Sequence, residues 1–202
     1  GLLKKQSSLG SLYGLTLETG IMLLPALAYL AYMGSQGETA FMAIDGVHRA
    51  TIKDDNVALR MTDVSRLEIH KEFSFLNTGS PHHVEMVTNL KDINVVDKGR
   101  AIRNNRYGAA GANINFVSKI SEDTFSVRTY ERGVEDETLS CGTGVTAVAL
   151  AMFDTKQTTS SKVYLKTQGG DLSVSFVKKE NTYTNIVLSG SATQVYKGIW
   201  EV

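Results

Sequence analysis

Two stretches of this chain follow the same order of expected elements: helix, strand, turn, strand, turn, strand. Placing Gly46 on Gly170 also places Gly20 on Gly144, so one alignment superimposes both helix entrances and both sets of strands. The helices are expected at 21–33 and after Cys141, and the strands at 39–46, 47–52 and 57–61 and at 162–170, 172–177 and 183–188. An internal duplication explains this agreement, and two unrelated hairpins that each follow a helix are the alternative.

The strand predictions depend on alternation and on turn residues. Leu172, Val174 and Phe176 alternate with polar residues, which is typical of a half-buried strand, and clusters of Asp, Asn, Lys and Glu at 54–56 and 179–181 indicate hairpin turns. We therefore expect a sheet and a helix in each copy.

The chain between the copies contains a turn-rich segment, 77–85, that enters an apolar strand. We interpret this segment as a crossing between two domains. The first domain would span 1–76 and be completed by a C-terminal strand at 191–202, while the second would span 77–190 and carry Cys141. Basic residues recur at helical spacing within 92–107, which indicates the solvated face of a helix.

The charge balance excludes several partners. Lys and Arg total 21 and Asp and Glu total 21, so no net field attracts nucleic acid or an anionic membrane surface. The apolar run at 21–33 contains Pro25 and is too short to cross a bilayer, and it lacks the flanks of a secretory signal. We expect a cytoplasmic protein without nucleic-acid or membrane partners.

The chain contains one cysteine, Cys141, which excludes an internal disulfide and a Cys-rich metal site. The four histidines lack a recognised ligand spacing, so we expect no metal and no cofactor. His82 and His83 are adjacent and would point to opposite faces of a strand. Cys141 is either a packed small apolar residue or a reactive thiol.

The segment 128–144 contains a predicted strand, a polar loop and the start of a helix. Cys141 would lie at the helix N-terminus, where unpaired amides and the helix dipole stabilise an anion, so its thiolate should form more easily. Gly142 and Gly144 leave the backbone accessible to a substrate carboxylate. This arrangement suits removal of a proton from a carbon next to a carboxylate. A tight helix entrance without any ligand is the alternative.

Other polar residues would contribute to the same site. Glu131 and Arg132 can hold the ammonium and carboxylate of an amino acid. Ser80 and His82 offer a hydroxyl and an imidazole. Asn113 and Asn115 offer side-chain amides. A surface ion pair, turn chemistry and strand-end capping are the alternatives for these residues taken singly.

Four motifs occur in this order: GSPH at 79–82, GANINFV at 111–117, RTYERG at 128–133 and CGTG at 141–144. Together they resemble the diaminopimelate epimerase family, from about Thr39 to the C-terminus. The resemblance implies an α+β fold of two pseudo-symmetric domains, each a curved sheet around a central helix, with the first domain incomplete here. It also implies an isomerase that interconverts L,L- and meso-diaminopimelate with a cysteine from each domain and without pyridoxal phosphate or metal.

The resemblance assigns roles to individual residues. Cys141 would be the acid/base of the second domain. The other assignments are substrate contacts: Gly142 and Thr143 at the reacting centre, Glu131, Arg132 and Asn113 at the distal amino-acid end, and Ser80 and His82 in the cleft.

The sequence departs from the family in the first domain, where the CGNG helix start is missing. The repeat places Leu17 opposite Cys141, and the family pattern places Thr19 there; neither side chain can replace a thiol. Three hypotheses follow: a diaminopimelate epimerase with an altered first-domain region, an inactive relative that binds an amino-acid-like ligand or a protein partner, and a single-base isomerase resembling the phenazine-biosynthesis isomerases. A homodimer is possible in each case.

Overall fold

The computed structural model describes residues 49–192, which form one mixed sheet and two α helices. The strands are β1 (Ala50–Lys53), β2 (Asn56–Arg60), β3 (Leu67–Ile69), β4 (Ser74–Asn77), β5 (Pro81–Met86), β6 (Asn113–Lys119), β7 (Thr124–Glu131), β8 (Asp136–Thr138), β9 (Lys162–Thr167), β10 (Gly170–Lys179) and β11 (Thr182–Ser191). A 3-10 turn, η1 (Leu90–Asp92), precedes helix α4 (Val95–Tyr107), and helix α5 (Gly142–Asp154) follows β8. The strand order is β1-β2-β11-β10-β9-β7-β6-β5-β4-β3, with β8 beside β7.

The structure contains hairpins at both positions that the repeat predicts. β1 pairs with β2 around a two-residue turn, and β10 pairs with β11 around another. Asp54 and Glu180 begin these turns with φ of 54° and 52°, a left-handed conformation that tight hairpin turns require. The strands predicted after 162 are confirmed as β9, β10 and β11. The predicted first-copy helix at 21–33 and strand at 39–46 lie outside the described residues.

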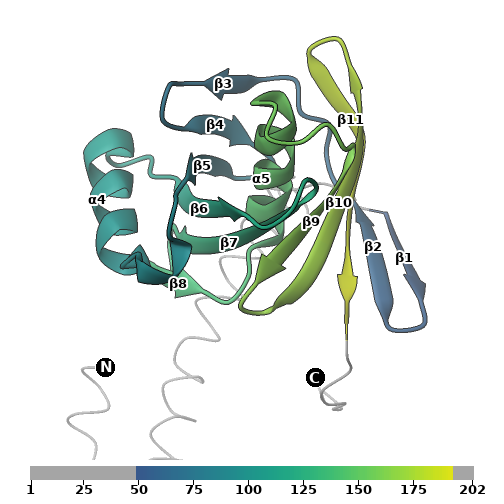
Figure 1. Cartoon of the computed structure of the whole chain (residues 1–202), viewed down its shortest axis with the longest axis horizontal. Helices are drawn as coiled ribbons and strands as arrows, with labels where there is room; N and C mark the ends of the chain where they lie inside the picture. The colour runs from purple at the N-terminus through teal and green to yellow at the C-terminus, as the bar shows by residue number, and fades with distance from the viewer. Residues whose placement is uncertain (1–48, 193–202) are drawn as a thin grey trace, which may run out of the picture. The chain divides into compact units, whose positions relative to one another are not determined.

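Helix α5 lies inside the curve of the sheet (Figure 1). Its residues 144–152 are all buried, because the helix is apolar on every side. They share one core with side chains from β4 to β7 and from β9 to β11. The expected curved sheet around a central helix is therefore confirmed for the second copy.

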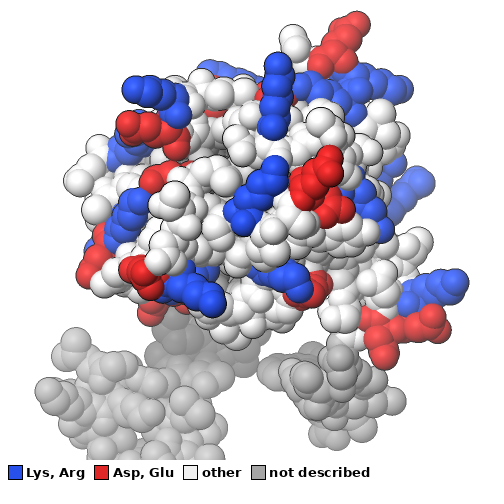
Figure 2. All heavy atoms as spheres, viewed as in Figure 1, with Lys and Arg blue, Asp and Glu red and all other residues white. Residues whose placement is uncertain are grey.

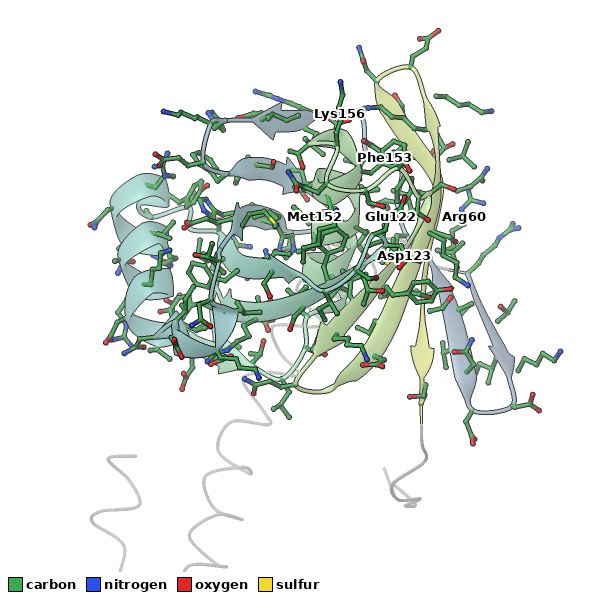
Figure 3. The ribbon with its side chains drawn as sticks, in the orientation of Figure 1. Arg60, Glu122, Asp123, Met152, Phe153 and Lys156 are labelled. Atoms are coloured by element: carbon green, nitrogen blue, oxygen red, sulfur yellow. The ribbon has the colours of Figure 1, made fainter. Side chains whose placement is uncertain are left out.

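The C-terminal end of α5 packs against the long strands β10 and β11. Figure 3 labels Met152 and Phe153 at this end of the helix. The Phe153 ring lies edge-on to Phe176, with ring centroids 5.2 Å apart, and edge-on to Tyr183 at 6.3 Å. The Tyr183 hydroxyl donates to Asp154 at 2.6 Å. Lys178 also pairs with Asp154, so aromatic edges and two polar contacts fix the end of the helix opposite Cys141.

The chain after β2 continues along β11 before it reaches the far edge of the sheet. The Met61 amide donates to the Ile186 carbonyl at 2.9 Å, and Val64 and Tyr183 exchange backbone hydrogen bonds of 2.9 and 2.8 Å. Because β3 and β4 follow directly, this segment connects the two ends of the curved sheet. β4 and β5 form an antiparallel hairpin in which Asn77 pairs with Pro81. The predicted domain boundary, between residues 76 and 77, therefore lies within this hairpin. The division into domains stays a prediction, and nearly all of the closing strand predicted at 191–202 lies outside the described residues.

Helix α4 covers the other face of β6 and β7. Asn94 caps its N-terminus by accepting from the Asp97 amide at 3.1 Å. Gly99 brings the helix close to the sheet, because a Cβ there would lie 2.4 Å from the Tyr130 Cβ. The predicted helix at 92–107 is confirmed. Its basic face is only partly solvated, since Lys98 pairs with Glu85 at 2.6 Å.

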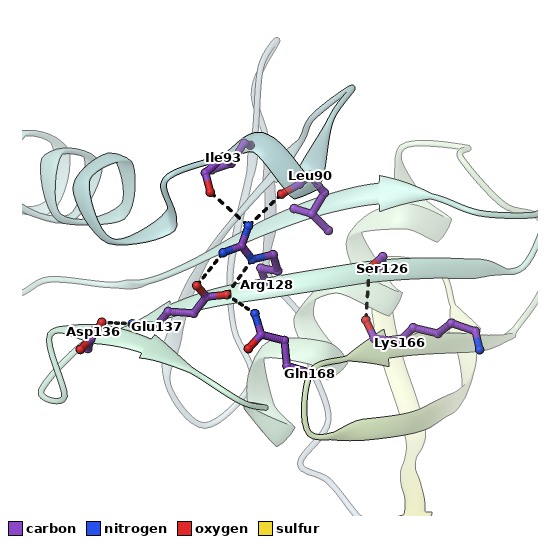
Figure 4. A network of polar contacts seen from close by, with 8 residues as sticks. All are labelled: Leu90, Ile93, Ser126, Arg128, Asp136, Glu137, Lys166 and Gln168. Atoms are coloured by element: carbon purple, nitrogen blue, oxygen red, sulfur yellow. Dashed lines mark hydrogen bonds and ion pairs between the residues drawn. The ribbon is translucent and has the colours of Figure 1, made fainter.

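Arg128 connects several elements on the outer side of β7 (Figure 4). Its guanidinium makes two 2.7 Å hydrogen bonds to the Glu137 carboxylate of β8. It also donates to the carbonyls of Leu90 at 3.0 Å and Ile93 at 3.1 Å, which fixes η1. Gln168 donates to the same carboxylate at 2.9 Å, so β7, β8, η1 and the turn after β9 are held together.

The visible surface carries both signs of charge. Figure 2 shows Lys and Arg interspersed with Asp and Glu across this face. In the described part of the chain, neither helix has the length and apolar character needed to span a bilayer.

Candidate active site

Alternate residues of three neighbouring strands face the N-terminus of α5. β5 and β6 pair with His82 opposite Asn113, and β6 and β7 pair with Asn115 opposite Thr129. Because strand side chains alternate between faces, Ser80 and His82 share this face, as do Asn113 with Asn115 and Thr129 with Glu131. The motifs that are distant in the sequence therefore converge here.

Cys141 is the N-cap residue of α5, as predicted, with extended backbone angles of −130° and 112°. It is 9% exposed. Burial raises the pKa of the Cys141 thiol. The Thr143 hydroxyl and the Gly144 and Thr143 amides oppose this rise, while the Glu131 carboxylate adds to it. The expectation that the helix N-terminus makes the thiolate easier to form is wrong for this environment, because desolvation outweighs the local donors.

Thr143 contacts the cysteine from the first turn of the helix. Its hydroxyl oxygen lies 3.5 Å from the Cys141 sulfur and 2.9 Å from Nε2 of His82. The Thr78 hydroxyl donates to the Thr143 carbonyl at 2.8 Å. The helix start is therefore held from the β4–β5 turn and from β5.

His82 and His83 point to opposite faces of β5, as predicted. His83 stacks on Phe73 at 4.5 Å between ring centroids and contacts the Tyr107 hydroxyl at 2.8 Å. His82 is fully buried behind Thr143, and burial together with the Arg132 charge lowers its pKa to about 3. The proposed substrate contact of His82 stays a prediction, and this position favours an indirect role through Thr143.

Asn113 joins Ser80 to the loop after β7. Its side-chain amide donates to the Ser80 hydroxyl at 2.8 Å and accepts from the Arg132 backbone amide at 2.8 Å. The Arg132 side chain is exposed and donates to the Ala110 carbonyl at 2.8 Å. Glu131 is half-buried and lies close enough to Cys141 to raise its pKa. Asn113 therefore connects Ser80 with the Arg132 backbone, and Glu131 lies near Cys141.

The two glycines of the predicted motif are in different surroundings. A Cβ on Gly142 would lie 3.1 Å from Leu188. A Cβ on Gly144 would lie 2.6 Å from Oδ1 of Asn115 and 3.3 Å from the Cys141 sulfur. Close packing against Asn115 and Cys141 therefore favours a glycine at 144, in addition to the expected approach of a ligand.

Sequence reasoning missed Thr78 and Thr129, both buried. Thr129 donates to Asn115 at 3.0 Å. A threonine within a strand that otherwise alternates apolar residues was the available signal. No cluster of three or more His, Cys, Asp or Glu side chains able to hold a metal ion occurs within residues 49–192.

Two solved structures of low sequence identity share this fold. A probable proline racemase from Agrobacterium radiobacter K84 is 16% identical with a TM-score of 0.53, covering 73% of this chain and 55% of its own. A PhzF-family phenazine biosynthesis protein from Bacillus anthracis is 10% identical with a TM-score of 0.53, covering 71% and 61%. At this identity the likeness concerns the fold alone.

The family profile for diaminopimelate epimerase matches residues 74–195. A diaminopimelate epimerase from Flavobacterium psychrophilum is 51% identical over 164 residues, 80% of this chain and 64% of that protein. One from Aquifex aeolicus is 42% identical over 126 residues, 61% of this chain and 44% of that protein. The chain belongs to the diaminopimelate epimerase family, and it spans less than two thirds of the length of these two relatives.

Proposed function

We propose that this chain supplies the second-domain half of an epimerase that interconverts L,L- and meso-diaminopimelate, a reaction of lysine biosynthesis, without pyridoxal phosphate. The observation that carries the proposal is the placement of Cys141 at the N-terminus of the buried helix α5, beside Thr143 and Glu131. The family membership supports the same substrate class.

The geometry supports Cys141 as the acid/base on one face of the α-carbon: a base from the first domain removes the α-proton on the opposite face, the Cys141 thiol gives its proton to the carbanion, and in the reverse direction the Cys141 thiolate removes that proton. Because burial raises the pKa of the thiol, the resting group is protonated near neutral pH. After the proton leaves, the Thr143 hydroxyl and the Thr143 and Gly144 amides stabilise the thiolate. A substrate carboxylate would bind the amides at the start of α5, where the helix dipole favours an anion.

The remaining residues would recognise the distal amino-acid end of the substrate. Arg132 supplies a guanidinium for a carboxylate, and Glu131 supplies a carboxylate for an ammonium. Asn113 and Ser80 are already hydrogen-bonded to each other, so they present a fixed amide and hydroxyl. His82 would support the site through Thr143.

A single-base isomerase of the same fold is the second candidate. It is favoured by the composition, because the sequence contains one cysteine and an epimerase of this type uses two. Leu17 and Thr19, which the repeat and the family pattern respectively predict opposite Cys141, lie outside the described residues. The two candidates predict different products: inversion at the α-carbon for the epimerase, and exchange or isomerisation without inversion for the single-base enzyme.

Proton exchange tests the proposal. The chain is incubated in heavy water with L,L- and with meso-diaminopimelate, and deuterium at the α-carbon is measured together with the isomer ratio. We expect exchange that is lost in Cys141→Ala and kept in Ser140→Ala, the exposed neighbouring residue. Exchange without inversion would favour the single-base candidate.

Absence of exchange from both isomers would reject the catalytic proposal. Alkylation of Cys141 with and without diaminopimelate would then show whether the chain binds this ligand without turnover.

We also propose a homodimer in the cytoplasm. Leu139 and Val134, in the chain leading to Cys141, are 67% and 58% exposed, which offers apolar contact area to a second copy. The single cysteine suits a reducing compartment. Light scattering of the purified protein and fractionation of cells test the two statements.

A further inference from the structure

Asn115 lies beneath the site on β6 and is fully buried. Its Nδ2 donates to the carbonyl of His83 at 2.9 Å and lies 3.2 Å from Nδ1 of His82. Its Oδ1 accepts from the Thr129 hydroxyl at 3.0 Å. Only the NH₂ end of the amide can donate to a carbonyl, so the contact with His83 fixes which end faces His82.

This orientation determines where the His82 ring carries its proton. Nδ1 faces a donor and must therefore accept. Burial and the positive charge of Arg132 lower the pKa of His82 to about 3, so the ring is neutral at physiological pH. A neutral ring with an unprotonated Nδ1 carries its hydrogen on Nε2.

The same reasoning extends to the cysteine. Nε2–H of His82 donates to the Thr143 hydroxyl oxygen across 2.9 Å. Because that oxygen is already accepting, the hydroxyl hydrogen is available for its other neighbour, the Cys141 sulfur at 3.5 Å. The order of donors runs from Asn115 through His82 and Thr143 to the sulfur.

The absence of a side chain at Gly144 leaves room for the Asn115 amide. A Cβ on Gly144 would lie 2.6 Å from Oδ1 of Asn115, so a glycine at the third position of α5 is what lets the amide occupy its place. Thr129 holds the same oxygen from β7. Asn115 is thereby fixed by strands on both sides and by the helix above.

We propose that Asn115 is a positioning residue, which fixes the Nε2–H form of His82 and so directs the Thr143 hydroxyl hydrogen to the Cys141 sulfur. Its catalytic consequence rests on the proposed function, but the hydrogen positions do not. The hydrogen bond favours the thiolate, whereas the reverse order would leave the sulfur without this donor.

The first test measures the histidines of the unaltered chain. Imidazole ¹⁵N chemical shifts of the full chain report which ring nitrogen of each histidine carries hydrogen, and His82→Gln assigns the signal. We expect the Nε2–H form for His82 in the unaltered chain. Observation of the Nδ1–H form would overturn the proposal.

The second test reverses the donor order. In Asn115→Asp the carboxylate can only accept, so His82 would carry hydrogen on Nδ1, Nε2 would accept from Thr143, and the sulfur would lose its donor. The charged groups facing this network are Arg132 near His82 and Glu131 near Cys141. Asn105→Asp adds the same charge at an exposed position of α4 and is the matched control.

The readout is the rate of Cys141 alkylation by iodoacetamide as a function of pH, which is specific because the chain has one cysteine. We expect about tenfold slower alkylation at neutral pH in Asn115→Asp and in Thr143→Val, since hydrogen bonds to charged groups are among the stronger ones. Thr143→Ser, which keeps the hydroxyl, should retain the original profile, as should Asn105→Asp.

The combination Asn115→Asp with Thr143→Val decides whether Asn115 acts through Thr143. A shift no larger than that of Thr143→Val alone supports the relay, and fully additive shifts overturn it. These outcomes can be distinguished from failure of the proposed function. If the alkylation profiles shift as expected but no α-proton exchange occurs, the epimerase proposal is rejected and the positioning role of Asn115 is kept.

Discussion

Replacement of Gly144 by alanine sets two opposing effects against each other. Alanine is favoured over glycine in a helix by about 1 kcal/mol, so propensity alone predicts a more stable protein. The added Cβ would lie 2.6 Å from Oδ1 of Asn115, 3.2 Å from the Cys141 Cβ and 3.3 Å from the Cys141 sulfur. Asn115 cannot simply withdraw, because Thr129 and the His83 carbonyl hold both ends of its amide.

The magnitudes favour destabilisation. Overpacking of a buried site costs typically 1–3 kcal/mol, and a displaced Asn115 loses hydrogen bonds of about 1 kcal/mol each. After the propensity gain is subtracted, we expect Gly144→Ala to lower the free energy of unfolding by about 2 kcal/mol. For a chain of this size that is a fall in Tm of roughly 4–8 °C.

Urea unfolding of Gly144→Ala, Asn115→Ala and the double variant measures this balance. Removal of the Asn115 amide makes room for the new methyl group, so Gly144→Ala should be neutral or stabilising in the Asn115→Ala background. An undiminished stability of the single variant would refute the steric argument. An equal loss in both backgrounds would show that the cost arises elsewhere.

Three further predictions concern the packing around the site. His82 has a folded pKa of about 3, below its unfolded value of 6.5, so its contribution to folding stability is complete above pH 6.5 and is lost as the pH falls. The free energy of unfolding, measured in urea, should therefore be lower at pH 5.0 than at pH 7.5 by roughly 2 kcal/mol from this group. This difference should be absent in His82→Gln and kept in His70→Gln. Arg128→Met leaves the half-buried Glu137 carboxylate with only the hydrogen bond from Gln168 and also removes the contacts to the Leu90 and Ile93 carbonyls, so it should cost about 3 kcal/mol of unfolding free energy, with Arg66→Met as an exposed control. Tyr183→Phe removes the hydrogen bond to Asp154 and should cost about 1 kcal/mol by the same measurement.

The sequence carries the local elements of this fold. Alternation at Leu172, Val174 and Phe176 is a direct consequence of a sheet with one buried face, and β10 follows it. The polar loop followed by glycines predicted a helix beginning after Cys141, and α5 begins at Gly142. These features depend on residues that are close in the sequence, so they can be predicted from local sequence patterns.

The contacts within the site depend on register between strands. His82 and Thr143 are 61 positions apart, and Asn115 and His82 are 33 apart. The motifs indicate that these residues belong together, but which of them touch follows from the parallel pairing of β5 with β6. The local pattern marks Thr129 only as a polar residue in a strand of alternating apolar residues, and its importance is its position across from Asn115 on β7.

The state of Cys141 shows how a correct local prediction can give a wrong chemical one. The helix N-terminus is where the sequence predicts it, and its amides act on the sulfur in the expected direction. The fold also leaves that sulfur only 9% exposed, and the loss of water outweighs the local donors. In the proposed reaction this makes the thiol a resting proton donor, while the Thr143 hydroxyl and the amides matter once the proton has gone. Burial therefore determines the pKa of the Cys141 thiol. The hydrogen bonds that run from Asn115 through His82 to Thr143 stabilise the thiolate.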